Sequence, residues 1–124
     1  MLIVDDEALA RERLVRLLQR ILPEAQVREA SNGIQAVSMA TEEPPELILL
    51  DIRMPGMDGI EVASQLQAME DSPAVVFCTA YDSYALDALE QQAVAYLLKP
   101  VREEQLRSAI DRAGRVNRLQ LASL

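Results

Sequence analysis

The chain has 124 residues, half of them hydrophobic, which suffices for one compact domain whose core needs neither disulfides nor a structural metal. It contains no histidine, so histidine-based zinc sites, Ser-His-Asp or Cys-His catalytic groups and an internal phosphohistidine are excluded. A formal net charge of −8 argues against tight binding of nucleic acid by the chain as a whole.

The cellular location is predicted from cysteine content and hydropathy. The single cysteine, Cys78, cannot form an internal disulfide, which is consistent with a reducing cytoplasm. We expect its thiol to be a small buried hydrophobe rather than a redox sensor, because nothing basic beside it in the sequence would lower its pKa. No apolar run reaches the roughly 18 residues of a membrane span, and the first residues do not resemble a signal peptide. We therefore expect a cytoplasmic domain without a membrane partner.

Five short, mostly apolar runs predict strands. They cover residues 2–4, 26–30, 47–50, 74–78 and 94–98. Four of them are almost continuously apolar rather than alternating, which is typical of parallel strands buried on both faces. The run at 26–30 is weaker.

Segments with helical spacing separate these runs. Apolar residues recur at steps of three and four in the first segment, which Pro23 should end. Four further helices are expected over about 34–40, 60–69, 82–92 and 106–113. Asp82 or Ser83 is expected to cap the fourth of the five, and Gly114 to end the last. Regular alternation of strand and helix predicts an open, doubly wound α/β fold.

Polar residues stand at the carboxyl ends of four predicted strands, where such sheets bind ligands. Asp5 and Asp6 follow the first strand, Asp51 follows the third, Thr79 ends the fourth and Lys99 follows the fifth. Because these strand ends share one edge of the sheet, we expect three carboxylates, a hydroxyl and an ammonium to meet in one cleft.

This set of groups favours magnesium and phosphoryl chemistry. Neighbouring carboxylates repel one another, and Mg²⁺ is held by carboxylates and water while sharing its shell with phosphate. Asp51 is the expected nucleophile, because a carboxylate can form an acyl phosphate, and Thr79 offers its hydroxyl to a phosphoryl oxygen. Lys99, the only lysine beside eleven arginines, would pair with Asp51 or contact the phosphoryl group.

These motifs resemble those of the receiver domains of two-component response regulators, the CheY-like family. The matching segments are residues 2–7, 49–59, 78–80 and 96–100, and residues 51–56, 77–81 and 117–122 resemble the LytTR-type regulators more narrowly. The resemblance implies a flavodoxin-like, five-stranded parallel sheet of order 2-1-3-4-5 with five helices. It also implies a receiver domain over residues 1–115, with 116–124 beginning a linker to an output domain that is absent here.

The resemblance also implies a role for each acid. Asp51 would be the phosphoacceptor, taking a phosphoryl group from the phosphohistidine of a sensor histidine kinase. Asp6 would bind Mg²⁺ directly and Asp5 would bind it through water, with Asp51 as a further metal-binding residue. The backbone carbonyl of Arg53 would complete the metal site.

The remaining matched residues would transmit the signal. Lys99, joined to Pro100 by a cis peptide, would contact the phosphoryl group. Thr79 and Tyr96 would move as switch residues, and the face built from the fourth helix, fifth strand and fifth helix would change its affinity for partners. Arg53 and Tyr81 occupy positions that tune phosphoryl lifetime in such domains.

The implied partners lie outside this chain. They are the sensor kinase, a C-terminal DNA-binding domain that controls transcription, and a second copy in a homodimer, whereas this segment itself would bind no nucleic acid. Residues 102–124 carry five arginines against three acids, which suits either acidic partners or a solvated face.

Two other readings of the same residues stay open. A Mg²⁺-dependent aspartate-nucleophile phosphatase uses similar groups, but it has an Asp-x-Asp run on its first strand and a cap domain, whereas Asp5 and Asp6 are adjacent here. The chain could also be an interaction module that signals without phosphate. We expect a signalling domain and not an enzyme.

Overall fold

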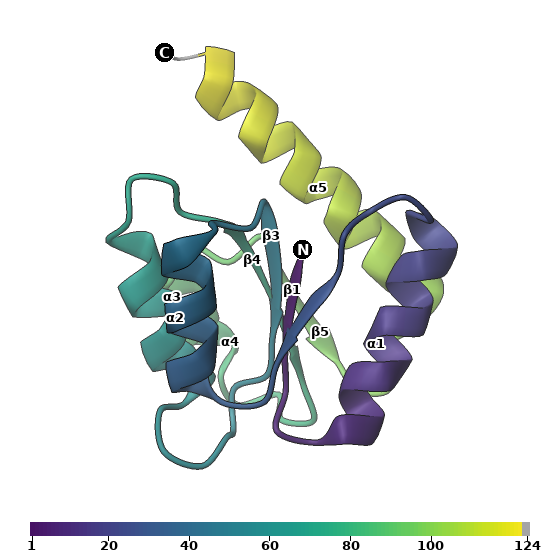
Figure 1. Cartoon of the computed structure of the whole chain (residues 1–124), viewed down its shortest axis with the longest axis vertical. Coiled ribbons are helices and arrows are strands. Elements are labelled where there is room, and N and C mark those ends of the chain that lie inside the picture. Colours follow the sequence, from purple (N-terminus) through teal and green to yellow (C-terminus); the bar gives the residue numbers. More distant parts are fainter. Residues whose placement is uncertain (123–124) are drawn as a thin grey trace.

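The structure is a computed structural model that describes the backbone of residues 1–122 and the side chains of residues 1–88 and 90–114. Strands and helices alternate along the whole chain (Figure 1). The elements are β1 (Leu2–Val4), α1 (Ala8–Ile21), β2 (Arg28–Ala30), α2 (Gly33–Glu42), β3 (Leu47–Leu50), α3 (Gly59–Gln67), β4 (Ala74–Thr79), α4 (Ala85–Glu90), β5 (Ala95–Leu98) and α5 (Glu103–Ala122).

The five strands form one parallel sheet in the order β2-β1-β3-β4-β5, which confirms the predicted fold. Val4 of β1 lies opposite Leu50 of β3. The amide of Asp51 donates to the carbonyl of Val4 at 3.0 Å, so Asp5 and Asp51 leave their strands at the same level. This register brings residues 46 positions apart in the sequence to one edge of the sheet.

Helices cover both faces of the sheet. In Figure 1, α1 and α5 lie on one face and α2, α3 and α4 on the other. Each face has its own apolar core, centred on Ile3, Leu49 and Leu106 on the first and on Ile48, Phe77 and Leu66 on the second. Burial on both faces explains why the central strands are continuously apolar, because neither face of the sheet meets water.

The fourth helix is shorter than predicted, Ala85–Glu90 instead of 82–92. Its first hydrogen bond runs from the Ala88 amide to the carbonyl of Tyr84, so the prediction that Asp82 or Ser83 caps it is wrong. Gln92 has a φ of 55°, and the Ala93 amide donates to the carbonyl of Ala88, which closes the helix in a left-handed turn.

The last helix is longer than predicted. It runs through Gly114 to Ala122, so the expectation that Gly114 ends it is wrong. A glycine inside a helix costs about 1 kcal/mol relative to alanine, which good helix formers on both sides offset, and no proline follows. In the part of the chain that the structure describes, no helix combines the length and the apolar character needed to cross a membrane.

Candidate functional site

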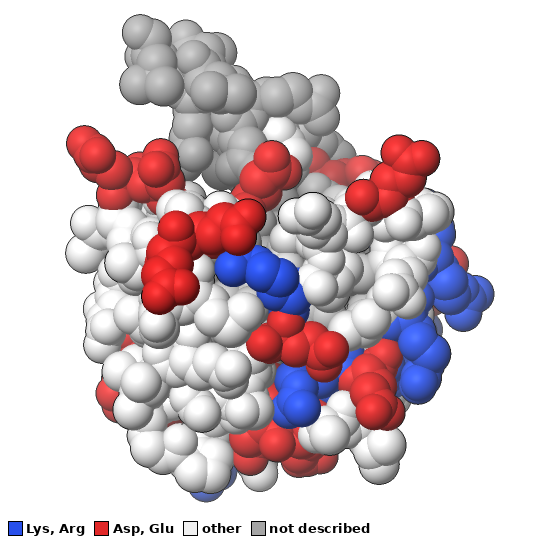
Figure 2. All heavy atoms as spheres, viewed as in Figure 1, with Lys and Arg blue, Asp and Glu red and all other residues white. Residues whose placement is uncertain are grey.

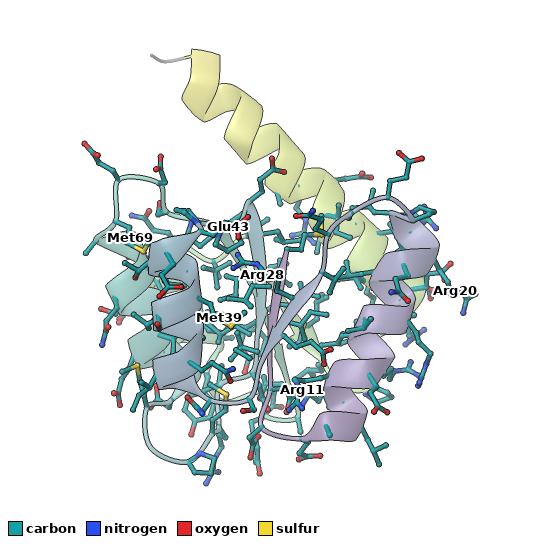
Figure 3. All side chains as sticks on the ribbon, viewed as in Figure 1. Arg11, Arg20, Arg28, Met39, Glu43 and Met69 are labelled. Atoms are coloured by element: carbon teal, nitrogen blue, oxygen red, sulfur yellow. The ribbon has the colours of Figure 1, made fainter. Side chains whose placement is uncertain are left out.

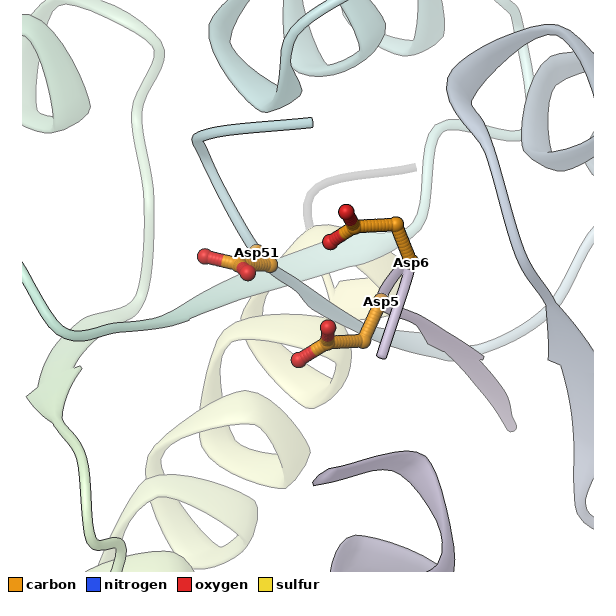
Figure 4. A group of neighbouring side chains, drawn as sticks. All are labelled: Asp5, Asp6 and Asp51. Carbon is orange, nitrogen blue, oxygen red and sulfur yellow. The ribbon is translucent and has the colours of Figure 1, made fainter. Parts of the chain in front are cut away.

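Three carboxylates gather at the carboxyl edge of the sheet. One oxygen from each of Asp5, Asp6 and Asp51 lies within 4.8 Å of the others. Figure 4 shows the three side chains pointing to the same side from the ends of β1 and β3. Asp5 and Asp51 are 1% and 7% exposed, while Asp6 is open to solvent. The acid cluster is therefore buried at its base and accessible at Asp6.

Lys99 enters the acid cluster from the end of β5. Its Nζ atom lies 2.6 Å from Asp5 Oδ2 and 3.2 Å from Asp51 Oδ2. The Lys99 amide donates to the carbonyl of Thr79 at 2.8 Å, which ties the residue to the end of β4. Its peptide bond to Pro100 is cis, as predicted. The sequence suggested a partner in Asp51, whereas the shorter contact is with Asp5.

Burial and charge shift the pKa values of this pair. Burial raises the pKa of Asp51, and the neighbouring charge of Asp5 raises it further, while Lys99 offsets part of the shift. Burial alone would lower the pKa of Lys99, but its hydrogen bond to Asp5 and the charges of Asp51 and Asp5 raise it overall. The acid cluster thus contains three carboxylates and a single ammonium, that of Lys99, to offset their charge.

The donor set fits Mg²⁺. All three side chains offer the hard oxygen atoms that Mg²⁺ prefers, and the exposed Asp6 leaves room for the waters that this ion retains. Asp5 Oδ1 accepts from the Glu7 amide at 2.9 Å and its Oδ2 accepts from Lys99. Both oxygens of Asp51 likewise have protein donors, the Ile52 amide and Lys99, so the exposed Asp6 is the best suited of the three to direct coordination. The role of the Arg53 backbone carbonyl as a further ligand stays a prediction.

Tyr81 connects the residues expected to act as switches. The buried Thr79 accepts from the Tyr81 amide through Oγ1 at 3.4 Å. The Tyr96 hydroxyl donates to the Tyr81 carbonyl, and its ring packs against Phe77 with centroids 6.4 Å apart. Thr79 and Tyr96 therefore share the backbone of one residue.

The Arg53 guanidinium lies over the ring of Tyr81, 4.6 Å from its centroid. Both residues line a cleft of about 500 Å³ between the loops after β3 and β4. Sequence reasoning singled out the two positions separately. It missed their contact, because the two loops are brought together only by the pairing of β3 with β4.

Cys78 is inert in this position. Burial raises the pKa of its thiol to about 12, although the charge of Lys99 acts in the opposite direction. A basic residue does lie near this thiol, which the sequence did not indicate, but desolvation outweighs it. A thiol that stays protonated is a poor nucleophile and a poor redox sensor.

Gly59 is a site residue that the sequence marked only as the end of the matched segment 49–59, beside the start of a helix. A Cβ atom on Gly59 would lie 2.1 Å from the carbonyl oxygen of Asp51. The Gly59 amide donates to the Ile52 carbonyl at 2.7 Å, and Asp58 caps α3 by accepting from the Glu61 amide at 2.9 Å. The start of α3 therefore packs directly on the backbone of Asp51, which only glycine permits.

The chain matches known proteins over its whole length. The family model for the response regulator receiver domain matches residues 1–111. The chain is 54% identical over 125 residues to the positive alginate biosynthesis regulatory protein of Pseudomonas aeruginosa, with 99% of the chain and 50% of that protein covered. It is 43% identical over 117 residues to the sensory transduction protein LytT of Bacillus subtilis, with 94% and 48% covered.

A solved structure agrees with these relatives. The signal receiver domain of the putative response regulator NarL from Mycobacterium tuberculosis is 34% identical and superposes with a TM-score of 0.79, covering 91% of this chain and 94% of that one. The chain spans about half the length of the curated relatives it matches. Their names agree with the LytTR-type resemblance seen in the sequence. On motif, topology and identity together, the chain belongs to the receiver domains of two-component response regulators.

Proposed function

We propose that the chain accepts a phosphoryl group on Asp51 from the phosphohistidine of a sensor histidine kinase. The observation that carries this proposal is the placement of Lys99 Nζ against both Asp5 and Asp51 within the acid cluster. The Asp51 carboxylate, the proposed nucleophile, therefore lies beside the Lys99 ammonium, with the carboxylates of Asp5 and Asp6 next to them. Such a set of groups stabilises charge on a transferring phosphoryl group.

In the transfer step, the bond between phosphorus and the kinase histidine breaks and a bond between phosphorus and an Asp51 oxygen forms. Asp51 Oδ1 accepts from the Ile52 amide at 2.8 Å, which orients the carboxylate. Lys99 moves from its ion pair with Asp51 to the phosphoryl oxygens, and Thr79 donates its hydroxyl to one of them. Asp5, Asp6, Asp51 and the Arg53 carbonyl would hold Mg²⁺, which supplies positive charge at the phosphoryl oxygens when bound.

The signal would leave the site through Tyr81. The Tyr81 backbone contacts Thr79 Oγ1 and the Tyr96 hydroxyl, so a shift of Thr79 reaches β5. Exposed apolar side chains stand nearby, Leu86 on α4 and Leu98 on β5. We propose that this α4–β5–α5 face changes its affinity for partners, including a second copy of the chain.

The output would be control of transcription in the cytoplasm by an attached DNA-binding domain. The support is that the relative from Pseudomonas aeruginosa is named a regulator of alginate biosynthesis and is about twice as long as this chain. On this proposal, residues 1–115 are the receiver domain, and 116–124 begin the linker to the output domain.

Incubation with acetyl phosphate and Mg²⁺, followed by mass spectrometry, tests the phosphoacceptor. We expect a gain of about 80 Da, the mass of one phosphoryl group, which is lost in Asp51→Asn and kept in the exposed control Asp82→Asn. A modification that survives Asp51→Asn contradicts the proposal. Sustained turnover of a phosphomonoester would support an aspartate-nucleophile phosphatase instead.

A further inference from the structure

Two arginines of α1 donate hydrogen bonds to the backbone of the two loops that carry the site. Arg11 Nη1 lies 2.8 Å from the carbonyl oxygen of Asp5, and Arg13 Nη2 lies 2.8 Å from that of Val101. The first loop carries the acids after β1, and the second begins at Lys99. One helix therefore holds both partners of the ion pair between Asp5 and Lys99 from outside the cluster.

The Arg11 side chain is fixed between two elements. Its Nε atom also donates to Glu29 of β2 at 3.3 Å, and its side chain is only 19% exposed. The Asp5 amide donates to Ala30 of β2 at 3.2 Å. The backbone of Asp5, where the turn after β1 begins, is thus held by β2 at its amide and by Arg11 at its carbonyl group. Figure 3 shows Arg11 at the edge where α1 faces β2.

Arg13 spans a space that side chains do not fill. A cavity of about 290 Å³ separates α1 from the loop after β5, lined by Ala10, Arg13, Leu14, Lys99, Pro100 and Val101. Val101 is 2% exposed and belongs to the same apolar core as Leu14, so packing holds this loop at Val101, and the bond from Arg13 to the Val101 carbonyl adds a directed contact across the cleft.

We propose that Arg11 and Arg13 are positioning residues: Arg11 sets the metal-binding geometry of the turn after β1, and Arg13 sets the reach of Lys99. This inference rests on the proposed function, since it concerns the same acid cluster. In the sequence the α1 arginines look like a solvated face, and Figure 2 shows basic side chains on the surface where α1 lies. Arg13 and Arg16 are both exposed on the same helix, but among the described residues only Arg13 of these two has a side-chain hydrogen bond, which makes Arg16 the matched control.

The sign of the effect separates positioning from simple electrostatics. Removing a cation near three carboxylates strengthens their attraction for Mg²⁺ if charge alone matters. Releasing the turn weakens Mg²⁺ binding, because the acids lose their fixed spacing; partners of this kind typically contribute about tenfold or more in metal affinity. The two explanations therefore predict opposite changes in Kd.

Calorimetric titration with Mg²⁺ of the whole chain tests Arg11. We expect Arg11→Met to raise the Kd for Mg²⁺ by about tenfold, Arg11→Lys to recover part of the loss, and the control Arg16→Met to leave it within about twofold. Hydrogen exchange of the Glu7 amide, which bonds to Asp5 Oδ1, should be faster in metal-free Arg11→Met. An unchanged or lower Kd, or unchanged Glu7 exchange, overturns the role of Arg11.

Arg13 has a different expected signature. Arg13→Met should keep the Kd for Mg²⁺ within about twofold and lower the rate of phosphorylation by acetyl phosphate at saturating Mg²⁺ by about tenfold, since only the Lys99 loop is released. If the Mg²⁺ affinity and the phosphorylation rate of Arg13→Met fall by the same factor, the role of Arg13 is merely structural and the proposal for Arg13 is overturned. If the wild-type chain neither binds Mg²⁺ nor is phosphorylated, the proposed function fails, whereas Glu7 exchange still reports whether Arg11 holds the turn.

Discussion

At the scale of single residues, the site is a balance between burial and charge. Asp51 and Asp5 are buried beside each other and share one half-buried cation, Lys99. Folding alone would not favour this arrangement, because like charges in a buried cluster oppose ionisation. We therefore expect the acid cluster to cost stability, as residues selected for the proposed function would.

Asp51→Asn should stabilise the fold at neutral pH. Burial raises the folded-state pKa of Asp51 above its ordinary value of 3.8. Between these two pKa values the folded state binds more protons than the unfolded state, so stability falls as pH rises through that window. Replacing the acid removes this cost, and we expect a gain of about 1 kcal/mol in the free energy of unfolding at pH 7. Urea unfolding measures it.

The gain should shrink as pH falls below the folded-state pKa of Asp51, because the wild-type carboxyl is then neutral. The exposed control Asp82→Asn should show no such gain. A destabilised Asp51→Asn variant at pH 7 would mean that the ion pair with Lys99 outweighs the burial of the charge.

Lys99→Met should tighten Mg²⁺ binding and abolish efficient phosphorylation. Lys99 Nζ competes for oxygens of Asp5 and Asp51, so its removal leaves them to the metal, while the transferring phosphoryl group loses a cation. Calorimetry and acetyl phosphate labelling measure the two effects separately. A weaker Mg²⁺ affinity in this variant would argue against direct competition.

At the scale of elements, the carboxyl ends of β1, β3, β4 and β5 build the site and the helices hold it in place. α3 begins on the backbone of Asp51, since Gly59 leaves no room for a side chain there. α1 contacts the two loops on either side of the acid cluster through Arg11 and Arg13. The helices therefore set the geometry of the loops as well as covering the sheet.

Gly59→Ala should destabilise the chain strongly. The new Cβ would stand 2.1 Å from the Asp51 carbonyl oxygen, so α3 or the strand end must move, at an expected cost of about 2–4 kcal/mol. Gly56→Ala is the matched comparison, because Gly56 has a φ of +79° but open space around it, and backbone strain alone costs about 1 kcal/mol. Urea unfolding ranks the two variants, and an equal loss would exclude the clash as the cause.

At the scale of the whole molecule, the contacts that hold the acid cluster and the exposed apolar side chains lie on different elements. The face covered by α1 and α5 holds the contacts of Arg11 and Arg13, and the α4–β5–α5 region carries the exposed Leu86 and Leu98. Tyr81 links the acid site to that region through Thr79 and Tyr96. On the proposed function, a change at the acid site would reach that surface through Tyr81 without a change of fold.

Beryllofluoride with Mg²⁺, a mimic of the phosphoryl group, should shift NMR signals in α4, β5 and α5 more than in α2. The reason is that the backbone of Tyr81 connects Thr79 to Tyr96, whereas α2 has no such link among the described contacts. Thr79→Ala should keep the shifts around Asp51 and lose those in β5. Unchanged signals on α4 and β5 would favour an interaction module that signals without phosphate.

The sequence by itself determined the fold class and the chemistry of the site. Continuous apolar strands alternating with amphipathic helices specify a parallel sheet, and acids at strand ends must then share an edge, because parallel strands all end on one side. The ends of α4 and α5 did not follow from local signals in the sequence. α4 is shorter and α5 longer than local signals predict, since packing and neighbouring residues override a single cap or glycine.

Only the tertiary structure decided which groups touch. The preference of Lys99 for Asp5, the stacking of Arg53 on Tyr81 and the backbone bonds of Arg11 and Arg13 join segments far apart in the chain. No local pattern encodes these contacts, because an arginine on a helix has the same periodicity whether it faces water or a carbonyl group. Periodicity reports which face is buried, whereas the partner of each polar group depends on how the loops meet after the sheet has formed.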